Sequence, residues 1–433
     1  MKKIHVVQIL ILVAITFLAG YYFGVNKVHL DWQNYKPSLS VVNQEPPPNL
    51  INVDFSPFWI VWQRLEAGYY DKTKLDEQQM LNGAIEGMVN SLGDPFTMYL
   101  PPVQNTNFKQ SLAGQFFGIG AELTTKEKSI IVISPLDGSP AEKAGIKAGD
   151  TIVGVDGKST ATWTLSQAVE KIRGPKGTQV VLTVVHKGSQ KSVDIKIIRD
   201  VIQVKSVAMN VLSAECTSTG CTLIPKGDPC TKSDCVDYAY LRLSQFGDNT
   251  NKEWAGMIKG IVDKMKSDNK VKGVVLDLRN NPGGYLTDAQ FIASEFLPQG
   301  DKIVYEDPCP PGSTEADCNL YVNRPGLLAD STFKVVILIN GGSASASEIV
   351  SGALRDHKRA ILVGEKSFGK GTVQEAEDLG DGAGLHVTIA KWLTPNGTWV
   401  HGKGLTPDVA VNLDPKNPDV DTQLEKAVFE LLK

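Results

Sequence analysis

Three serines lie close together in a segment whose pattern favours nucleophilic chemistry. Ser343, Ser345 and Ser347 alternate with alanines and follow two glycines. The residues before them, 333–340, form an apolar run typical of a buried strand, and the residues after them repeat apolar side chains with a helical period. A strand, a glycine turn and a helix place a side chain at a helix N-terminus, where free N–H groups can stabilise a developing negative charge. We therefore expect one of the three serines to be a nucleophile.

Such a serine needs a base, and two lysines follow in the next segment. Residues 360–363 form a second short apolar run, and Lys366 and Lys370 come after it. Lys366 adjoins Glu365 and is expected to be solvated, whereas Lys370 is flanked by glycines and apolar residues. Burial disfavours the charged form of a lysine and lowers its pKa from about 10.4 toward the working pH. We predict that Lys370 is the base.

Histidine is the commoner base, but none of the six histidines pairs convincingly with the serine cluster. His357 is flanked by charged residues, His386 alternates with apolar residues on a predicted strand, and His401 lies in a glycine-rich turn. We interpret these three as surface or core residues. The other three lie in the N-terminal apolar run, just after it and in a separate predicted domain: His5, His29 and His186.

The third segment that could join this site is residues 277–284, a turn rich in backbone donors that follows a predicted strand. From about residue 201 to 413 strands alternate with helices, which predicts an α/β core with a parallel-rich sheet. The functional residues of such sheets gather at the carboxyl ends of the strands. The predicted strands are 238–243, 271–278 and 333–340, and the predicted helices are 254–266, 289–296, 348–357 and 420–432.

Residues 106–200 have a different character, with short β-rich runs and one helix over 164–172. The segments 139–150 and 155–157 resemble a PDZ domain of the permuted kind found in exported bacterial proteases. In that family a peptide carboxylate sits in a glycine-containing loop, whose N–H groups converge on the anion. Leu165 and Val169 belong either to an apolar pocket for the terminal side chain or to the domain core. The residues that match the carboxylate loop are Phe117, Gly118, Ile119 and Gly120.

Length, charge and cysteine content limit the number of domains, the classes of partner and the cross-links that can be expected. The chain has 433 residues and a mass of 46.9 kDa, so about two to four domains are expected. Its formal charge of -4 favours no nucleic-acid partner. Six cysteines lie in two short stretches, and disulfides are expected if the chain is exported. We predict a Cys309–Cys318 pair. For the other four, Cys216, Cys221, Cys230 and Cys235, the pairing stays open, and a zinc site is the alternative.

The N-terminus predicts export. Lys2 and Lys3 precede a nearly uncharged apolar run over residues 4–25, which is long enough to cross a bilayer. We predict an uncleaved transmembrane anchor over 1–26, with a cleaved signal peptide as the alternative. The chain is then a single-pass protein of the cell membrane whose catalytic part is extracytoplasmic. A polar spacer over 27–54 follows, and then a helical segment over 55–105 that we interpret as a packing bundle without chemistry.

The three candidate segments together resemble the C-terminal processing peptidases, or tail-specific proteases. The similar residues are 277–284, 342–349 and 368–374, with further similarity at 87–95 and 402–408. The resemblance covers the chain from about residue 55 to its end. It implies an α/β protease core with an inserted PDZ domain. The implied catalytic roles are Ser345 as nucleophile, Lys370 as base, Gln374, one helical turn later, as the residue that orients the lysine, and Ala346 with Gly283 or Gly284 as the oxyanion hole.

The resemblance implies a serine endopeptidase that cleaves proteins near their C-termini, and the N-terminal apolar run adds the membrane anchor. The PDZ domain would bind the substrate C-terminus and gate activity, and Arg173 matches an arginine that links the two domains in regulated members. No cofactor or metal is expected. The expected partners are protein substrates with accessible C-termini, the membrane, and a homodimer or an adaptor protein. A catalytically inactive PDZ scaffold at the cell envelope is the rival.

The domain boundaries complete these expectations. The protease core should cover residues 201–413, and a C-terminal helical segment should cover 414–433. Two cysteine-bearing stretches, near 214–235 and 308–318, depart from the family pattern and are expected to be insertions at surface loops.

Overall fold

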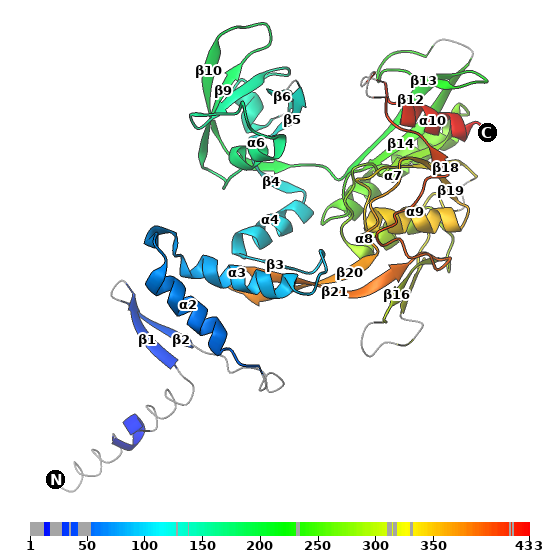
Figure 1. Ribbon diagram of the computed structural model, residues 1–433. Helices are drawn as coiled ribbons and strands as arrows, with labels where there is room; N and C mark the ends of the chain where they lie inside the picture. Colours follow the sequence, from blue (N-terminus) through cyan, green and yellow to red (C-terminus); the bar gives the residue numbers. More distant parts are fainter. Residues whose placement is uncertain are drawn as a thin grey trace, which may run out of the picture. The chain divides into compact units, whose positions relative to one another are not determined.

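The computed structural model describes residues 13–17, 28–33, 36–41, 53–126, 129–136, 138–230, 234–309, 314, 318–329, 332–414, 417 and 420–433 (Figure 1). The chain divides into two compact units, Met1–Leu81 and Asn82–Lys433. Within the described residues no helix is both long and apolar enough to span a bilayer. Apart from 13–17, the predicted anchor over residues 1–26 lies outside the described residues.

The first unit contains a hairpin and a helix that differ from their predicted roles. β1 (Val28–Gln33) pairs with β2 (Lys36–Val41) within the segment predicted to be a spacer, which gave no sign of a hairpin. Apolar residues alternate with polar ones along β1, which is the period of a strand. α2 (Ser56–Gly68) carries the predicted apolar stripe, but none of its residues is buried. In the described residues α2 therefore does not form the predicted packed bundle.

The predicted PDZ domain forms a six-stranded sheet in the order β10-β9-β7-β6-β5, with β8 paired to β7. Ile130, Ile152 and Leu182 lie in its core. Two strands at the ends of the domain, β4 (Gln115–Gly118) and β11 (Asp200–Gln203), pair with each other. The other elements are β5 (Ala121–Lys126), β6 (Ser129–Pro135), α5 (Pro140–Lys143), β7 (Thr151–Val155), β8 (Lys158–Ser159), α6 (Leu165–Ile172), β9 (Gln179–Val185) and β10 (Ser192–Ile198).

The protease core is built on a seven-stranded sheet in the order β13-β12-β14-β15-β18-β19-β22 (Figure 1). All pairings from β14 to β22 are parallel, which confirms the predicted α/β core. Helices α7, α8 and α9 pack on one face of the sheet and α10 packs on the other. The strands are β12 (Val207–Cys216), β13 (Cys221–Leu223), β14 (Cys235–Leu243), β15 (Val271–Asp277), β18 (Lys334–Ile339), β19 (Ala360–Gly364) and β22 (Val409–Ala410). The helices are α7 (Thr250–Ser267), α8 (Leu286–Ser294), α9 (Ala346–Asp356) and α10 (Thr422–Leu431).

A second, five-stranded sheet was not predicted. Its order is β17-β16-β21-β20. β3 pairs with residues 384–386 of β21. α3 and β3 come from the predicted helical segment over 55–105, and α4 extends from it into the range predicted for the PDZ domain. The elements are α3 (Glu77–Asn90), β3 (Met98–Leu100), α4 (Pro102–Leu112), β16 (Lys302–Asp307), β17 (Asn319–Tyr321), β20 (Thr372–Gly380) and β21 (Ala383–Leu393).

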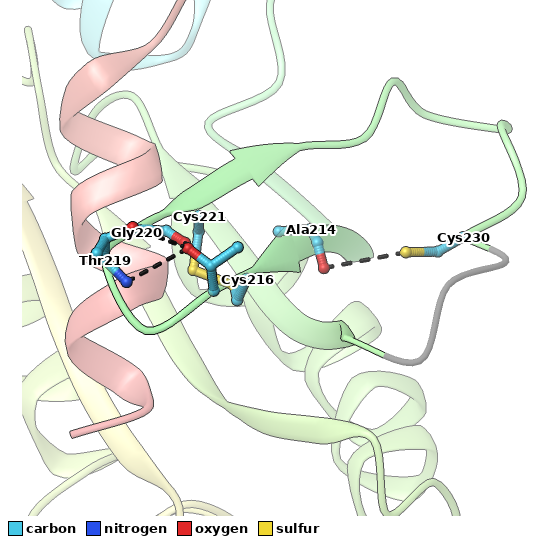
Figure 2. The surroundings of a disulfide bond; sticks show 7 residues. Ala214, Cys216, Thr219, Gly220, Cys221 and Cys230 are labelled. Carbon is cyan, nitrogen blue, oxygen red and sulfur yellow. Dashed lines mark hydrogen bonds between the residues drawn. A yellow bond between two sulfur atoms is a disulfide. The ribbon is translucent and has the colours of Figure 1, made fainter.

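The six cysteines form three disulfides: Cys216–Cys221, Cys230–Cys235 and Cys309–Cys318. The predicted Cys309–Cys318 pair is confirmed. Figure 2 shows Cys216 and Cys221 joined across the β12–β13 hairpin, beside the red helix α10. Both cysteines pack into the same buried cluster as α10, so this insertion extends the core as well as the surface. Cys230 Sγ lies 3.9 Å from the Ala214 carbonyl oxygen.

Candidate active site

Ser345 stands at the turn between β18 and α9, and its φ of 53° is rare for a residue with a side chain. The other two serines of the cluster are buried and engaged. The Ser343 hydroxyl donates to the Leu278 carbonyl at 2.8 Å, and the Ser347 hydroxyl donates to the Asn281 carbonyl at 2.9 Å. Of the three, Ser345 is the one that lines a cavity of about 330 Å³.

Lys370 lines the same cavity as Ser345, just before β20 begins. Its ammonium lies 5.2 Å from the centre of the Phe96 ring. Burial lowers the pKa of Lys370 below the ordinary lysine value, and the nearby carboxylate of Asp94 opposes this shift. Lys366, the other candidate, is exposed. The geometry thus places a serine and a half-buried lysine with a depressed pKa in the wall of one cavity, and these are the two groups that lysine-assisted acyl transfer requires.

The buried carboxylate of Glu348 holds the main chain of both segments. Its Oε2 accepts the N–H groups of Ser345 and Lys370, each at 2.9 Å. Its Oε1 accepts the Ser367 hydroxyl at 2.5 Å and the Gly369 N–H at 2.7 Å. One fully buried side chain therefore fixes the serine turn relative to the lysine segment. Glu348 was not among the residues predicted from the sequence, although its position three residues after Ser345 at a helix start is the spacing of a capping box.

Gly283 approaches the serine turn so closely that a side chain could not fit there. A Cβ built on Gly283 would lie 2.8 Å from Ser345 Cβ and 2.9 Å from the Ala346 nitrogen. Ala346 is the first residue of α9, so its N–H has no acceptor within the helix. A Cβ built on Gly284 would instead collide with the Phe246 carbonyl, away from the serine. Of the two glycines, Gly283 is the one beside the predicted oxyanion site.

Asn281 joins the glycine turn to the serine turn. Its backbone carbonyl accepts the Ala344 N–H at 3.0 Å, and its side-chain amide donates to the Leu243 carbonyl at 2.8 Å. Its Oδ1 accepts the Gly283 N–H at 2.9 Å. An oxyanion bound at Gly283 would therefore have to replace Asn281 Oδ1 as the acceptor of that N–H.

Buried charges anchor the start of the same turn. Asp277 is fully buried and is paired with Arg279 at 2.7 Å and with Arg242 at 2.9 Å. Burial raises the pKa of Asp277, but the two arginines outweigh it and the net pKa is lowered. Arg279 also pairs with Asp421 at the start of α10, at 2.8 Å. The C-terminal helix is thereby tied to the turn that carries Gly283.

Gln374 lines the cavity, but from a strand. Because β20 begins at Thr372, the four-residue spacing from Lys370 is not a helical turn, as the sequence analysis described it. The Gln374 side-chain amide donates to Thr372 Oγ1 at 2.8 Å and to Thr388 Oγ1 at 3.1 Å.

Two histidines lie closer to the site than the sequence indicated. His386 is 7% exposed, lines the cavity and meets the Phe108 ring edge-on. Burial lowers the pKa of His386, and the charges of Lys370 and Lys109 lower it further. His401 stacks on Trp399 with ring centres 5.1 Å apart. Strand alternation alone could have placed His386 on a buried face, but not in a cavity.

The segment that we interpreted as free of chemistry supplies part of the cavity wall. Phe96 lines it from the loop before β3 and Met98 from β3, while Phe108 of α4 lines it from just beyond that segment. The interpretation of residues 55–105 as a bundle without chemistry is therefore wrong for its second half. These residues reach the site because β3 pairs with β21, which no local pattern reports.

The predicted carboxylate loop of the PDZ domain lines a cavity of its own, of about 260 Å³. Ile119 also belongs to the domain core, where it is 3% exposed. Leu165 packs against that core and lines a neighbouring larger cavity rather than this one. The predicted residues that line the loop cavity are Phe117, Gly118, Ile119, Gly120 and Val169.

Arg173 follows α6 and lines the same loop cavity. Its guanidinium lies 5.0 Å from the centre of the Phe116 ring, and its side chain passes 3.8 Å from the position of a Cβ on Gly118. In this arrangement the arginine contacts the carboxylate loop.

The pairing of the cysteines distinguishes the two alternatives that the sequence left open, disulfides and a zinc site. Because all four cysteines of the first stretch are in disulfides, the zinc site is excluded. The part of the chain that the structure describes contains no cluster of three or more His, Cys, Asp or Glu side chains arranged to hold a metal ion.

Comparison with known proteins agrees with this architecture. The model of peptidase family S41 matches residues 237–411, a PDZ domain model matches residues 106–185, and the model of the activating protease CtpB N-terminal domain matches residues 18–102. A solved structure of a putative S41 protease from Bacteroides fragilis has the same fold, with a TM-score of 0.55 and 16% identity. The match covers 90% of this chain and 97% of that one.

Two relatives are similar over most of their length. A carboxy-terminal-processing protease of Bartonella bacilliformis is 40% identical over 354 residues, which cover 82% of this chain and 74% of that protein. The carboxy-terminal processing protease CtpB of Bacillus subtilis is 32% identical over 403 residues, which cover 93% of this chain and 75% of that protein. The chain is thus a serine peptidase with a PDZ domain and belongs to the carboxy-terminal processing proteases of peptidase family S41.

Proposed function

We propose that this protein is an endopeptidase that cleaves proteins near their C-termini with a dyad of Ser345 and Lys370. The observation that carries the proposal is the cavity that both side chains line, with Glu348 holding the two segments together. The depressed pKa of Lys370 supports a neutral lysine that can accept a proton. In this proposal Gln374, which lines the same cavity, orients the lysine.

The reaction is acyl transfer to the serine. Neutral Lys370 takes the proton of the Ser345 hydroxyl as the oxygen attacks the peptide carbonyl. The resulting oxyanion binds the Ala346 N–H and the Gly283 N–H, which leaves Asn281 Oδ1. Lys370 then gives its proton to the leaving amine, and the C–N bond breaks. Lys370 then takes a proton from a water molecule as it attacks the acyl-enzyme, and returns that proton to the Ser345 oxygen as the ester C–O bond breaks.

Single variants of the dyad test this proposal. Ser345→Ala and Lys370→Ala should each lower kcat/KM on a peptide with an unstructured C-terminus by about 10⁴-fold or more, because members of a catalytic unit act together. Both variants should also lose labelling by a serine-directed acylating probe. Ser343→Ala is the matched control, since its hydroxyl donates to a backbone carbonyl away from the cavity. Cleavage by Ser345→Ala but not by Ser343→Ala would refute the assignment.

The rival function is a PDZ scaffold without catalysis. It predicts that the wild-type protein takes up no acylating probe and cleaves no peptide, although it still binds C-terminal peptides. Labelling of the wild type that is lost in Lys370→Ala would exclude the rival.

We propose further that the PDZ domain binds the substrate C-terminus and gates the protease. The carboxylate would sit at the loop that contains Gly118 and Gly120, where N–H groups can converge on an anion, and Val169 would contact the terminal side chain. Arg173 beside this loop would pass the binding event to the protease. A peptide with an amidated C-terminus should bind more weakly than the free acid, and Arg173→Ala should change kcat more than peptide affinity.

We also propose that residues 1–26 anchor the protein in the cell membrane, with the protease outside the cytoplasm. The support is the apolar run over residues 4–25 after two lysines. The full chain should sediment with membranes and resist extraction by high salt, and a protease added to intact cells or spheroplasts should degrade its PDZ domain. Release of a shortened chain into the soluble fraction would favour the cleaved signal peptide instead.

A further inference from the structure

A lysine base must be held so that its amine reaches the serine, and Lys370 lies just outside regular structure. β20 begins two residues later, so the lysine has no partner in the strand ladder. On one side, the N–H groups of Gly369 and Lys370 donate to Glu348. The carbonyls of the same segment need donors as well, because buried backbone oxygens are rarely left unpaired.

Two indole rings supply those donors. Trp392 Nε1 donates to the Lys370 carbonyl at 3.0 Å, and Trp399 Nε1 donates to the Gly371 carbonyl at 2.8 Å. The Trp392 backbone N–H donates to the Gly371 carbonyl at 3.1 Å, and the Gly402 N–H donates to the Gly369 carbonyl at 2.9 Å. The carbonyls of three consecutive residues, Gly369 to Gly371, thus each accept a hydrogen bond from outside the segment.

The indole of Trp392 is placed so that it can fix the Lys370 carbonyl. It is 1% exposed on β21, and it also forms part of the wall of the catalytic cavity. An indole is a rigid donor with a single N–H, so it fixes the direction of the carbonyl that it binds. Rotation of the peptide group that follows Lys370 would swing the lysine side chain, and this hydrogen bond opposes that rotation.

We propose that Trp392 is a positioning residue for Lys370, acting through its indole N–H on the lysine's own carbonyl, and that Trp399 assists it through the next carbonyl. This inference rests on the proposed Ser345–Lys370 dyad. Neither tryptophan takes part in bond making. They keep the amine of Lys370 inside the cavity, where it is shielded from water.

The test is Trp392→Phe, which keeps an aromatic ring and deletes the N–H. The matched control is Trp254→Phe, because Trp254 is also fully buried and donates its Nε1–H to the Glu295 carboxylate at 3.2 Å, within the core of α7 and α8. Both variants should lose a similar amount of thermal stability. Trp392→Phe alone should lower kcat about 10-fold or more with little change in KM, since small misplacements of catalytic groups are costly.

The pH profile separates positioning from general destabilisation. A lysine that is less firmly held inside the cavity gains water, so in Trp392→Phe the acidic limb of the kcat/KM profile should move to higher pH. Trp399→Phe removes a 41% exposed indole and should show a smaller shift of the same sign without a large loss of stability. An unchanged profile in both variants, or an equal loss of kcat in Trp254→Phe, overturns the inference.

The experiments distinguish an error in the role of Trp392 from an error in the assignment of the Ser345–Lys370 dyad. If Ser345→Ala and Lys370→Ala abolish acylation while Trp392→Phe behaves like Trp254→Phe, the dyad stands and the positioning role is wrong. If Lys370→Ala keeps full activity, the dyad itself is wrong and the role of Trp392 falls with it.

Discussion

Replacing Glu348 with glutamine tests how the active site is held together. The carboxylate accepts four hydrogen bonds, two on each oxygen. The amide of glutamine offers one oxygen and one NH₂ group. If the NH₂ group replaced Oε2, it would face the N–H groups of Ser345 and Lys370, and neither can accept. We therefore expect it to replace Oε1, where the Ser367 hydroxyl can turn and act as the acceptor.

In that orientation one hydrogen bond is lost, from the Gly369 N–H. A hydrogen bond to a charged group is worth about 1.5–3 kcal/mol, so Glu348→Gln should destabilise the protein by about that amount. Glu348→Ala leaves all four donors without an acceptor in a buried site. At about 1–3 kcal/mol for each unsatisfied group, that loss is large compared with the total stability of a typical domain.

The assay should combine stability with two kinetic readouts. Glu348→Gln should fold, melt at a lower temperature and cleave an unstructured peptide about 10- to 100-fold more slowly, because Gly369 adjoins the lysine. Its rate of labelling by an acylating probe should fall in parallel. A variant that loses stability but keeps its full kcat and labelling rate would show that Glu348 supports folding only. A variant with unchanged stability and unchanged kinetics would refute the role that we assign to the four hydrogen bonds of Glu348.

Two further predictions concern the oxyanion site and the pH profile. Gly283→Ala should lower kcat by about 10²-fold or more, since its Cβ would enter the oxyanion site. Gly300→Ala, with a similar positive φ of 89° but open space around it, should lose stability without losing activity. Asp94→Asn removes a charge that raises the pKa of Lys370, so that pKa should fall. Because the neutral lysine is the active form in the proposed dyad, the acidic limb of the kcat/KM profile should then move to lower pH, and a shift to higher pH would contradict this reasoning.

The strands of the parallel sheet could be predicted from the sequence because they are buried on both faces. β18 and β19 consist almost wholly of apolar residues and β15 contains the run Val274–Leu276, and a run of that kind needs no knowledge of its neighbours to be recognised. β20 was missed for the opposite reason, although a strand around His386, within β21, was expected. Residues 375–380 of β20 are exposed and include three acidic residues, so they do not show the apolar pattern of a buried strand.

In the candidate site, too, some residues could be predicted from the sequence and others could not. The sequence predicted that a serine in the cluster and a lysine after the next strand would meet at the carboxyl ends of parallel strands. In the structure the two strands, β18 and β19, are adjacent and parallel. It did not predict Phe96, Phe108 or His386 in the cavity wall. Those residues arrive through pairings and packing between segments that are far apart in the chain, and their local sequence carries no trace of the contact.

The sequence by itself determined the order of domains, the buried strands and the residue types available for catalysis, because these depend on neighbours a few positions away. Resemblance to a family then selected Ser345 among three serines. Only the tertiary structure supplied a physical reason for that choice. Ser343 and Ser347 donate to carbonyls of Leu278 and Asn281, more than 60 positions earlier in the chain, while Ser345 faces the cavity with Lys370. Hydrogen-bond partners at such separations are set by how strands and helices pack, and that packing decides which hydroxyl is left for chemistry.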